Sequence, residues 1–209
     1  MRFRHLRDNS FSRWDWVNFT YRVPTRDRRP ESCHVHEESI VPDGSIPPAE
    51  RERFLTPLIV GSALDASKHD RSLALIRPRN TRFVAKRKPP ATLQRERQAY
   101  AWASRQGSFL DPDLAELEPS PFEFRFSFDD EAGRHDYVNG DWEAHAMFWR
   151  ERKRSGEAEA LRWMSGKFNE DYPRAGMVFA LGNQAKRPQT WQLLGVVRLD
   201  NTGQASLAL

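Results

Sequence analysis

The densest group of side chains capable of acid–base chemistry lies between Arg134 and His145. His135, Asp141 and Glu143 are residue types that act as general acids, general bases or ligands of hard metal ions. A strand that leads into a helix would bring the three together, and Arg134 would steady an anionic substrate. These residues are therefore the candidates for a metal-assisted enzyme of nucleic-acid or nucleotide metabolism.

The same segment also has a structural interpretation. Asp141 follows Gly140 and suits the N-cap of a helix, and Glu143 in the first turn is favoured by the helix dipole. Because Glu143 and His145 are two positions apart, they would face different directions on that helix. We favour this interpretation, assign no catalytic residue and expect no bound metal or cofactor. The buried stripe of the helix would then consist of Trp142, His145, Ala146 and Trp149.

The single cysteine of the chain, Cys33, stands directly before His34 and close to His36. This spacing matches neither a CxxC zinc element nor an HExxH helix, so we interpret the two histidines as a solvated or packed pair. The sequence has no glycine-rich phosphate loop, no GxSxG nucleophile turn and no kinase signature. One cysteine also cannot form a disulfide framework within the chain.

Basic side chains concentrate in three segments, near Tyr21, Phe83 and Trp191. Of the 33 basic residues 27 are arginine, whose guanidinium pairs with phosphate through two hydrogen bonds and stacks on bases. Acidic residues cluster elsewhere, so we expect a basic face that holds phosphates beside aromatic rings. The predicted nucleic-acid contacts are Arg77, Arg79, Arg82, Lys86, Arg87, Lys88, Lys186 and Arg187.

The elements that must position these residues are read from hydrophobic periodicity. The clearest strand is Phe122–Phe128, where four phenylalanines alternate with polar residues. The order of elements predicts an α+β fold with a largely antiparallel, barrel-like sheet and a helical hairpin between Asp141 and Asp171. Strands are expected at residues 14–23, 73–77, 81–86 (a hairpin with 73–77), 122–128, 134–138, 177–181 and 190–199. Helices are expected at 49–64, with a start, break or kink at Pro57, and at 93–106, 142–154 and 157–171.

Length and composition indicate one globular unit. The chain has 209 residues, and its 13 Phe and 7 Trp supply a core although only 38% of residues are hydrophobic. We expect a single domain over residues 1–209, with an ordered core from 14 to 199 and tails at 1–13 and 200–209. No signal-peptide pattern and no run of about 18 apolar residues is present, so we expect a cytoplasmic protein without membrane contact.

Several short elements recur in the order seen in a group of uncharacterised bacterial and archaeal proteins, which the chain resembles from about residue 14 to 199. They are Arg-Pro-Glu-Ser at 29–32, Leu-Ala-Leu-Ile-Arg-Pro at 73–78, Phe-Glu-Phe-Arg-Phe at 122–126, Gly133 to His135, Asp-Trp-Glu at 141–143, and Phe-Ala-Leu-Gly at 179–182 with Trp191 and Gly195. The resemblance implies no activity. Members of that group have a cysteine pair ahead of the Gly-x-His element and an additional N-terminal strand region. Residues 129–132 contain no cysteine, so no zinc site is expected. The N-terminal sheet would be either incomplete or completed by a partner.

Three functions follow from these observations. The first is a non-catalytic nucleic-acid-binding module or accessory subunit that uses the basic segments. The second is the metal-assisted enzyme built on His135, Asp141 and Glu143. The third is a protein-interaction subunit of a larger complex.

Overall fold

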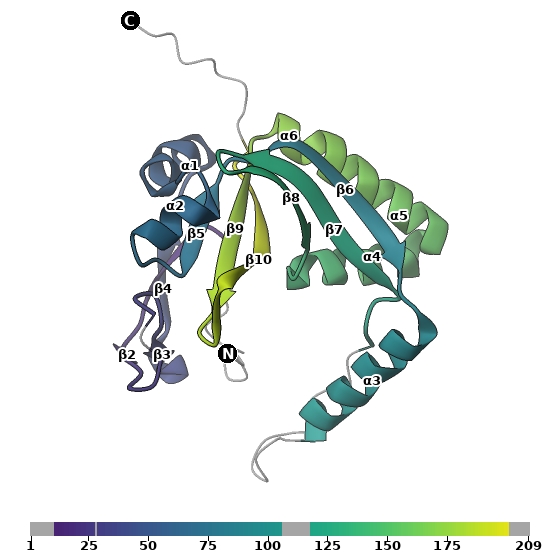
Figure 1. Ribbon diagram of the computed structural model, residues 1–209, viewed down its shortest axis with the longest axis horizontal. Helices are drawn as coiled ribbons and strands as arrows, with labels where there is room; N and C mark the ends of the chain where they lie inside the picture. Colours follow the sequence, from purple (N-terminus) through teal and green to yellow (C-terminus); the bar gives the residue numbers. More distant parts are fainter. Residues whose placement is uncertain (1–10, 28, 106–117, 201–209) are drawn as a thin grey trace, which may run out of the picture.

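The computed structural model describes residues 11–27, 29–105 and 118–200, and its centre is the phenylalanine-rich strand (Figure 1). This strand, β7 (Phe122–Asp130), pairs antiparallel with β6 (Arg79–Arg87) on one side and with β8 (Gly133–Val138) on the other. Because successive side chains of a strand point to opposite faces, every second residue of β7 from Phe122 to Asp130 is buried. The prediction of this strand is confirmed.

A second antiparallel sheet consists of β5 (Leu73–Ile76), β9 (Met177–Gln184) and β10 (Arg187–Arg198), with β9 in the middle. The predicted hairpin between residues 73–77 and 81–86 is wrong, because β5 pairs with β9 whereas β6 pairs with β7. Burial explains the difference. Ile76 packs beside β9, and Phe83 packs on the phenylalanine face of β7, so the two neighbouring strands bury apolar side chains on different sheets.

The predicted helical hairpin is present and lies along one face of the sheet that contains β7 (Figure 1). This is the phenylalanine face, because Phe148 of the hairpin contacts Phe122 and Phe124. It consists of α4 (Trp142–Ser155) and α5 (Glu157–Gly166), joined at Gly156, whose φ of 88° lies in the region that favours glycine. The predicted buried stripe of α4 is wrong: Trp142 is 53% exposed, Ala146 is exposed as well, and His145 and Trp149 are half-buried. The helix turns a different face inward, which is formed by Ala144, Phe148 and Glu151.

The chain beyond α5 continues as the π-helical turn η3 (Lys167–Asp171) and the short helix α6 (Tyr172–Arg174) before entering β9. The helix predicted at residues 93–106 is α3 (Pro90–Arg105), which extends away from the two sheets (Figure 1).

The N-terminal region is built from short elements rather than the longer ones that periodicity predicts. The expected strand at 14–23 is divided in two, and the expected helix at 49–64 ends at Leu55, two residues before Pro57, which cannot donate a backbone hydrogen bond. These elements are β1 (Asp15–Asn18), β2 (Tyr21–Arg22), β3 (His34–Val35), η1 (Glu37–Ser39), β4 (Val41–Ser45), α1 (Pro48–Leu55), η2 (Thr56–Leu58) and α2 (Ala63–Lys68).

The two three-stranded sheets meet where β8 ends beside β10. Asn139 and Leu193 form an isolated parallel bridge, and the Gly140 amide donates to the Leu193 carbonyl at 2.9 Å. The expectation of a largely antiparallel α+β fold is confirmed. The sheets do not close into a barrel within the described ranges, because this contact is a bridge and not a ladder. None of the helices in those ranges combines the length and apolarity needed to cross a membrane.

Replacing Phe126 with alanine should destabilise the protein strongly. The Phe126 side chain is fully buried and its ring contacts those of Phe83, Phe168 and Phe179, so truncation removes apolar burial and leaves a cavity. We expect a loss of about 3 to 5 kcal/mol in the free energy of unfolding, measured by urea denaturation. The control is Trp102→Ala on α3, whose side chain is 66% exposed and which should change stability by less than about 0.5 kcal/mol.

Candidate functional site

A cleft of about 990 Å³ lies where six segments of the chain meet. These are the loop between β2 and β3, helix α2, the turn from α2 to β5, the turn between β7 and β8, strand β8, and the hairpin of β9 and β10. The cleft therefore lies between the two sheets on the side of α2. Its polar and aromatic lining includes Arg26, Arg29, Asp70, Arg71, His135, Tyr137, Asn183 and Trp191.

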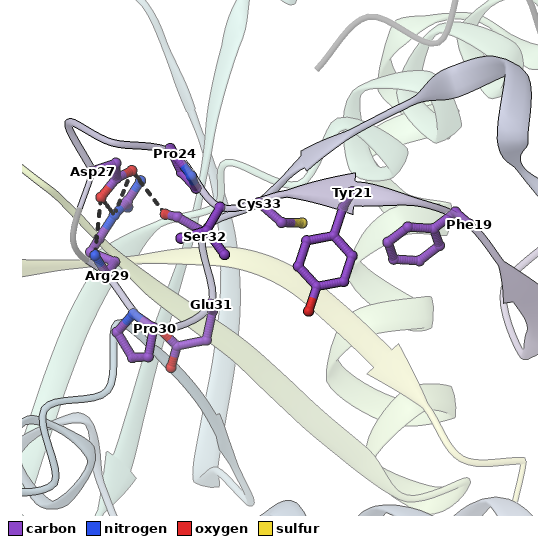
Figure 2. A pocket seen from close by; sticks show the side chains of 10 residues that line it. Phe19, Tyr21, Pro24, Asp27, Arg29, Pro30, Glu31, Ser32 and Cys33 are labelled. Atoms are coloured by element: carbon purple, nitrogen blue, oxygen red, sulfur yellow. Dashed lines mark hydrogen bonds and ion pairs between the residues drawn. The ribbon is translucent and has the colours of Figure 1, made fainter.

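The first wall of the cleft is fixed by Arg29, which belongs to the Arg-Pro-Glu-Ser element. Its guanidinium pairs with the Asp27 carboxylate at 2.6 Å and donates to the Asn183 carbonyl of β9 at 2.7 Å. Hydrogen bonds from Arg29 and from the Ser32 hydroxyl lower the pKa of Asp27 far below its ordinary value. Figure 2 shows Asp27, Arg29 and Ser32 joined in this way. Arg29 thus fastens the N-terminal loop to the central strand of the second sheet.

Glu31, two residues further on, makes a second connection between the N-terminal loop and the second sheet. Its carboxylate accepts hydrogen bonds from the backbone amides of Ser72 and Leu73 and from the Ser72 hydroxyl. Burial alone would raise the pKa of Glu31, but these hydrogen bonds outweigh it and the pKa is lowered. Glu31 therefore fixes the start of β5 and the backbone beside Arg71.

Two arginines of the cleft have no carboxylate partner in the described part of the chain. Arg26 and Arg71 are both exposed, and neither takes part in an ion pair or side-chain hydrogen bond there. The turn between β9 and β10 adds Lys186 and Arg187, whose neighbours Ala185 and Pro188 line the cleft. The positive charge of Arg29, in contrast, is neutralised by Asp27.

Two aromatic side chains line the same cleft. Trp191 of β10 is half-buried, and its indole N–H donates to the Ser67 hydroxyl of α2 at 3.2 Å, which fixes the ring. Tyr137 of β8 is half-buried, and burial together with the charge of Asp130 raises its pKa. The cleft thus combines free cations with two aromatic surfaces.

His135 lies on β8 and is paired with a carboxylate that the sequence interpretation missed. Its Nε2 lies 2.8 Å from Oδ1 of Asp130, the last residue of β7. The Asp130 side chain is 1% exposed and that of His135 is 20% exposed, so the imidazole stands between the carboxylate and the cleft. The alternation of β7 could have predicted this pair, because Asp130 occupies the next inward position of the strand after Phe128.

The turn that carries Asp130 is also joined to the segment ahead of α2. The Glu131 amide donates to the Gly61 carbonyl at 3.1 Å, and the Glu131 carboxylate lies over Gly61. A Cβ atom at position 61 would approach that carboxylate to 2.0 Å, so the absence of a side chain at Gly61 permits this contact.

The structure does not bring the predicted acid–base residues together. Asp141 caps α4 through Oδ1 and accepts a hydrogen bond from the Val196 amide through Oδ2 at 3.0 Å, while Glu143 pairs with Arg13. Each of the three therefore has a different partner, and among the residues described no group of three or more His, Cys, Asp or Glu side chains is arranged to hold a metal ion. Only His135 faces the cleft.

Most of the predicted nucleic-acid contacts on and beside β6 have partners within the protein. The guanidinium of Arg77 pairs with Glu52 and that of Arg79 donates to the Asp130 carbonyl. Arg87 pairs with Glu157 and Lys88 pairs with Glu96, whereas Arg82 and Lys86 are exposed without an ion pair in the described ranges. The turn with Lys186 and Arg187 lies on the other sheet, at a distance from β6 (Figure 1).

A second, smaller hollow of about 550 Å³ lies on the other side of the Arg29 loop (Figure 2). It is lined by Phe19, Tyr21 and Cys33 together with that loop. Cys33 is half-buried there, and His34 and His36 are both exposed. The Cys33 segment therefore forms no metal site in the part of the chain that is described.

This arrangement of antiparallel sheets and a covering helical hairpin defines an α+β protein made of two sequence regions. A family model described as Domain of unknown function (DUF8757) matches residues 59–208, and because this span exceeds half of the chain, the protein belongs to that family. A second model, Domain of unknown function (DUF8758), matches residues 1–57. No curated protein and no solved structure matches the chain. The cleft takes Arg26, Asp27, Arg29 and Pro30 from the first region and its other lining residues from the second.

Replacing Glu31 with glutamine should destabilise the protein in a pH-dependent way. Because the pKa of Glu31 is lowered on folding from its ordinary 4.5, its carboxylate stabilises the protein above that pH, and this stabilisation is lost as pH falls through the folded value. We expect Glu31→Gln to lower the free energy of unfolding by about 1 kcal/mol at pH 7 and by progressively less below pH 4.5, measured by urea denaturation.

The matched control is Glu38→Gln, since the Glu38 side chain is 82% exposed and lies 3.9 Å from His36 as its nearest ionic partner. The free energy of unfolding of this variant should equal that of the wild type at pH 7 and below pH 4.5. A constant difference between the Glu31 variant and the wild type from pH 7 to pH 3 would contradict the assigned role of the carboxylate.

Proposed function

We propose that the protein binds single-stranded nucleic acid, with the cleft holding a nucleotide unit. The observation that carries this proposal is the combination of Arg26 and Arg71, which have no carboxylate partner among the described residues, with the aromatic side chains of Trp191 and Tyr137 in one cleft. Binding of single strands without strong sequence preference uses this combination, because cations hold the phosphates while rings stack on the bases.

The charge of the cleft suits a phosphate group. The charge of Asp27 is neutralised by Arg29. Asp70 is then the lining carboxylate whose negative charge offsets part of the positive charge of Arg26 and Arg71. Lys186 and Arg187 in the adjoining turn add further positive charge at the rim. The guanidinium groups can each bind a phosphate through two hydrogen bonds, and the fastened backbone beside Arg71 limits the entropy lost when they do.

The aromatic side chains suit a base. The hydrogen bond from the Trp191 indole to Ser67 holds the ring in one orientation, so that a base can stack on it without first ordering the side chain. Stacking of a base on an aromatic ring contributes about 1 to 3 kcal/mol. We propose this cleft as the binding site in place of β6, because four of the basic side chains predicted on and beside β6 have partners within the protein.

The double substitution Arg26→Ala with Arg71→Ala should weaken binding about tenfold or more and reduce its salt dependence. Each lost phosphate contact lowers the slope of log K against log salt by about 0.7 for a single strand. The measurement is fluorescence anisotropy of labelled oligo-dT and oligo-U at two salt concentrations. Arg53→Ala on α1, an exposed arginine without an ion pair in the described ranges, is the control and should bind as the wild type does.

If the wild type does not bind either oligonucleotide at low salt, the proposal fails. If substitution of Arg82 and Lys86 weakens binding while substitution of Arg26 and Arg71 does not, the site lies on β6 as the sequence predicted.

Replacing Trp191 with alanine should weaken binding by about tenfold without changing the salt slope, because stacking releases no counterions. Anisotropy at the same two salt concentrations measures both quantities. Trp102→Ala, on the exposed surface of α3, is the matched control. An equal loss of affinity in both variants would remove Trp191 from the binding site.

A further inference from the structure

We propose that His135, oriented by Asp130, acts as a general base that activates water to hydrolyse a phosphodiester bond of the nucleic acid held in the cleft. This inference rests on the proposed function, since it places the substrate in that cleft. It adds an activity to binding and assigns the chemistry to a pair of residues different from the His135, Asp141 and Glu143 set.

The geometry of β7 and β8 brings the pair together. Phe128 stands opposite His135 in the antiparallel register, so their side chains share the inward face, and Asp130 is the next inward position along β7. Oδ1 of Asp130 accepts the Ala132 amide at 2.8 Å and lies 2.8 Å from Nε2 of His135. A neutral imidazole that donates from Nε2 to this carboxylate has its basic lone pair on Nδ1, an assignment inferred from the hydrogen bond.

Two further contacts hold the imidazole in place. The rings of Phe128 and Tyr137 lie 5.1 Å and 5.4 Å from that of His135, measured between ring centroids. The carboxylate behind it is buried, and Nδ1 has no partner in the described part of the chain. A base on a rigid strand, oriented by a buried carboxylate and facing a cleft, has the arrangement that general-base catalysis requires.

A structural role as the hydrogen-bond acceptor of the Ala132 amide does not by itself account for a carboxylate at position 130. Its Oδ2 atom is buried and has no hydrogen-bond partner in the described ranges, although an unsatisfied buried carboxylate oxygen costs free energy. A serine or asparagine at this position would satisfy the Ala132 amide at lower cost. The carboxylate is the group that stabilises an imidazolium, the charged form that His135 takes when it removes a proton from water.

The proposed step is a hydrolysis whose atoms balance. Nδ1 of His135 takes a proton from water while the water oxygen forms a bond to phosphorus. The bond from phosphorus to one bridging sugar oxygen breaks, and this oxygen receives the proton back from the imidazolium through solvent. The products are a phosphomonoester and a free hydroxyl group, and Arg26 and Arg71 neutralise the charge on the non-bridging oxygens.

The test uses the full-length chain with fluorescein-labelled single-stranded RNA and DNA, with binding followed by anisotropy and cleavage by denaturing gel. We expect cleavage by the wild type and at least a 100-fold slower rate for His135→Gln, in which the amide can still donate to Asp130 but has no basic nitrogen. The rates are compared at saturating substrate, and the affinity of this variant is measured beside them, so that a lost contact at the cleft lining is separated from a loss of chemistry. In the His135→Ala variant, added imidazole should restore part of the cleavage, which a structural role of His135 would not allow.

Asp130→Asn tests the positioning residue. We expect a rate at saturating substrate about tenfold lower with an unchanged KM, because the substrate does not contact Asp130. His34→Gln, at an exposed histidine outside the cleft, is the matched control and should cleave as the wild type does.

The outcomes separate this inference from the binding proposal. If the wild type binds but cleaves neither the RNA nor the DNA, the inference is overturned and the binding proposal stands. The same conclusion follows if His135→Gln and His135→Ala cleave as fast as the wild type. If the wild type neither binds nor cleaves, both fail. Cleavage of RNA alone would assign the substrate as RNA, and cleavage of both strands would assign single-stranded nucleic acid in general.

Discussion

Burial of the phenylalanine face of β7 is the interaction on which the rest of the structure depends. Phe122, Phe124, Phe126 and Phe128 are each at most 5% exposed. Helix α4 covers them through Phe148, the turn η3 through Phe168, and the second sheet through Phe179. Because each of these side chains removes a large apolar area from water, strand, helices and second sheet are stabilised as one unit. The inward row ends in Asp130, so the same alternation that forms the core also delivers a carboxylate to the edge of the cleft.

The N-terminal region is attached to the second sheet mainly by hydrogen bonds of charged side chains rather than by apolar burial. Arg29 donates a hydrogen bond to a carbonyl of β9, and Glu31 accepts hydrogen bonds from backbone amides at the start of β5. A small apolar contact of Leu55 with Val178 and Leu199 adds to this link. Charged groups bonded to backbone atoms fix orientation more sharply than apolar packing does, since hydrogen bonds require a defined direction. Arg26 consequently has a defined place beside α2, although the strands around it are only two to five residues long.

The sequence predicted those features whose signal is local. The alternation of β7, the helical hairpin and the capping role of Asp141 all rest on neighbouring residues, and each is present. Features that depend on distant partners were not predictable in this way. The pairing of β5 with β9 joins residues more than 100 positions apart, and the cleft joins Arg26 to Trp191. The pairing of Asp130 with His135 lies between these cases, because it spans one turn and could have been found by extending the alternation of β7 by one inward position.

The backbone hydrogen bond between Gly61 and Glu131 has a consequence for how the cleft selects what enters it. It ties the segment ahead of α2 to the turn between β7 and β8, so two parts of the chain that line the cleft, at Ala63 and at Ala132, are joined to each other directly. A ligand that enters here meets a lining whose two parts are already connected. Recognition at this end is therefore by preformed shape, which lowers the conformational entropy lost on association and excludes ligands that are too bulky, whatever their charge.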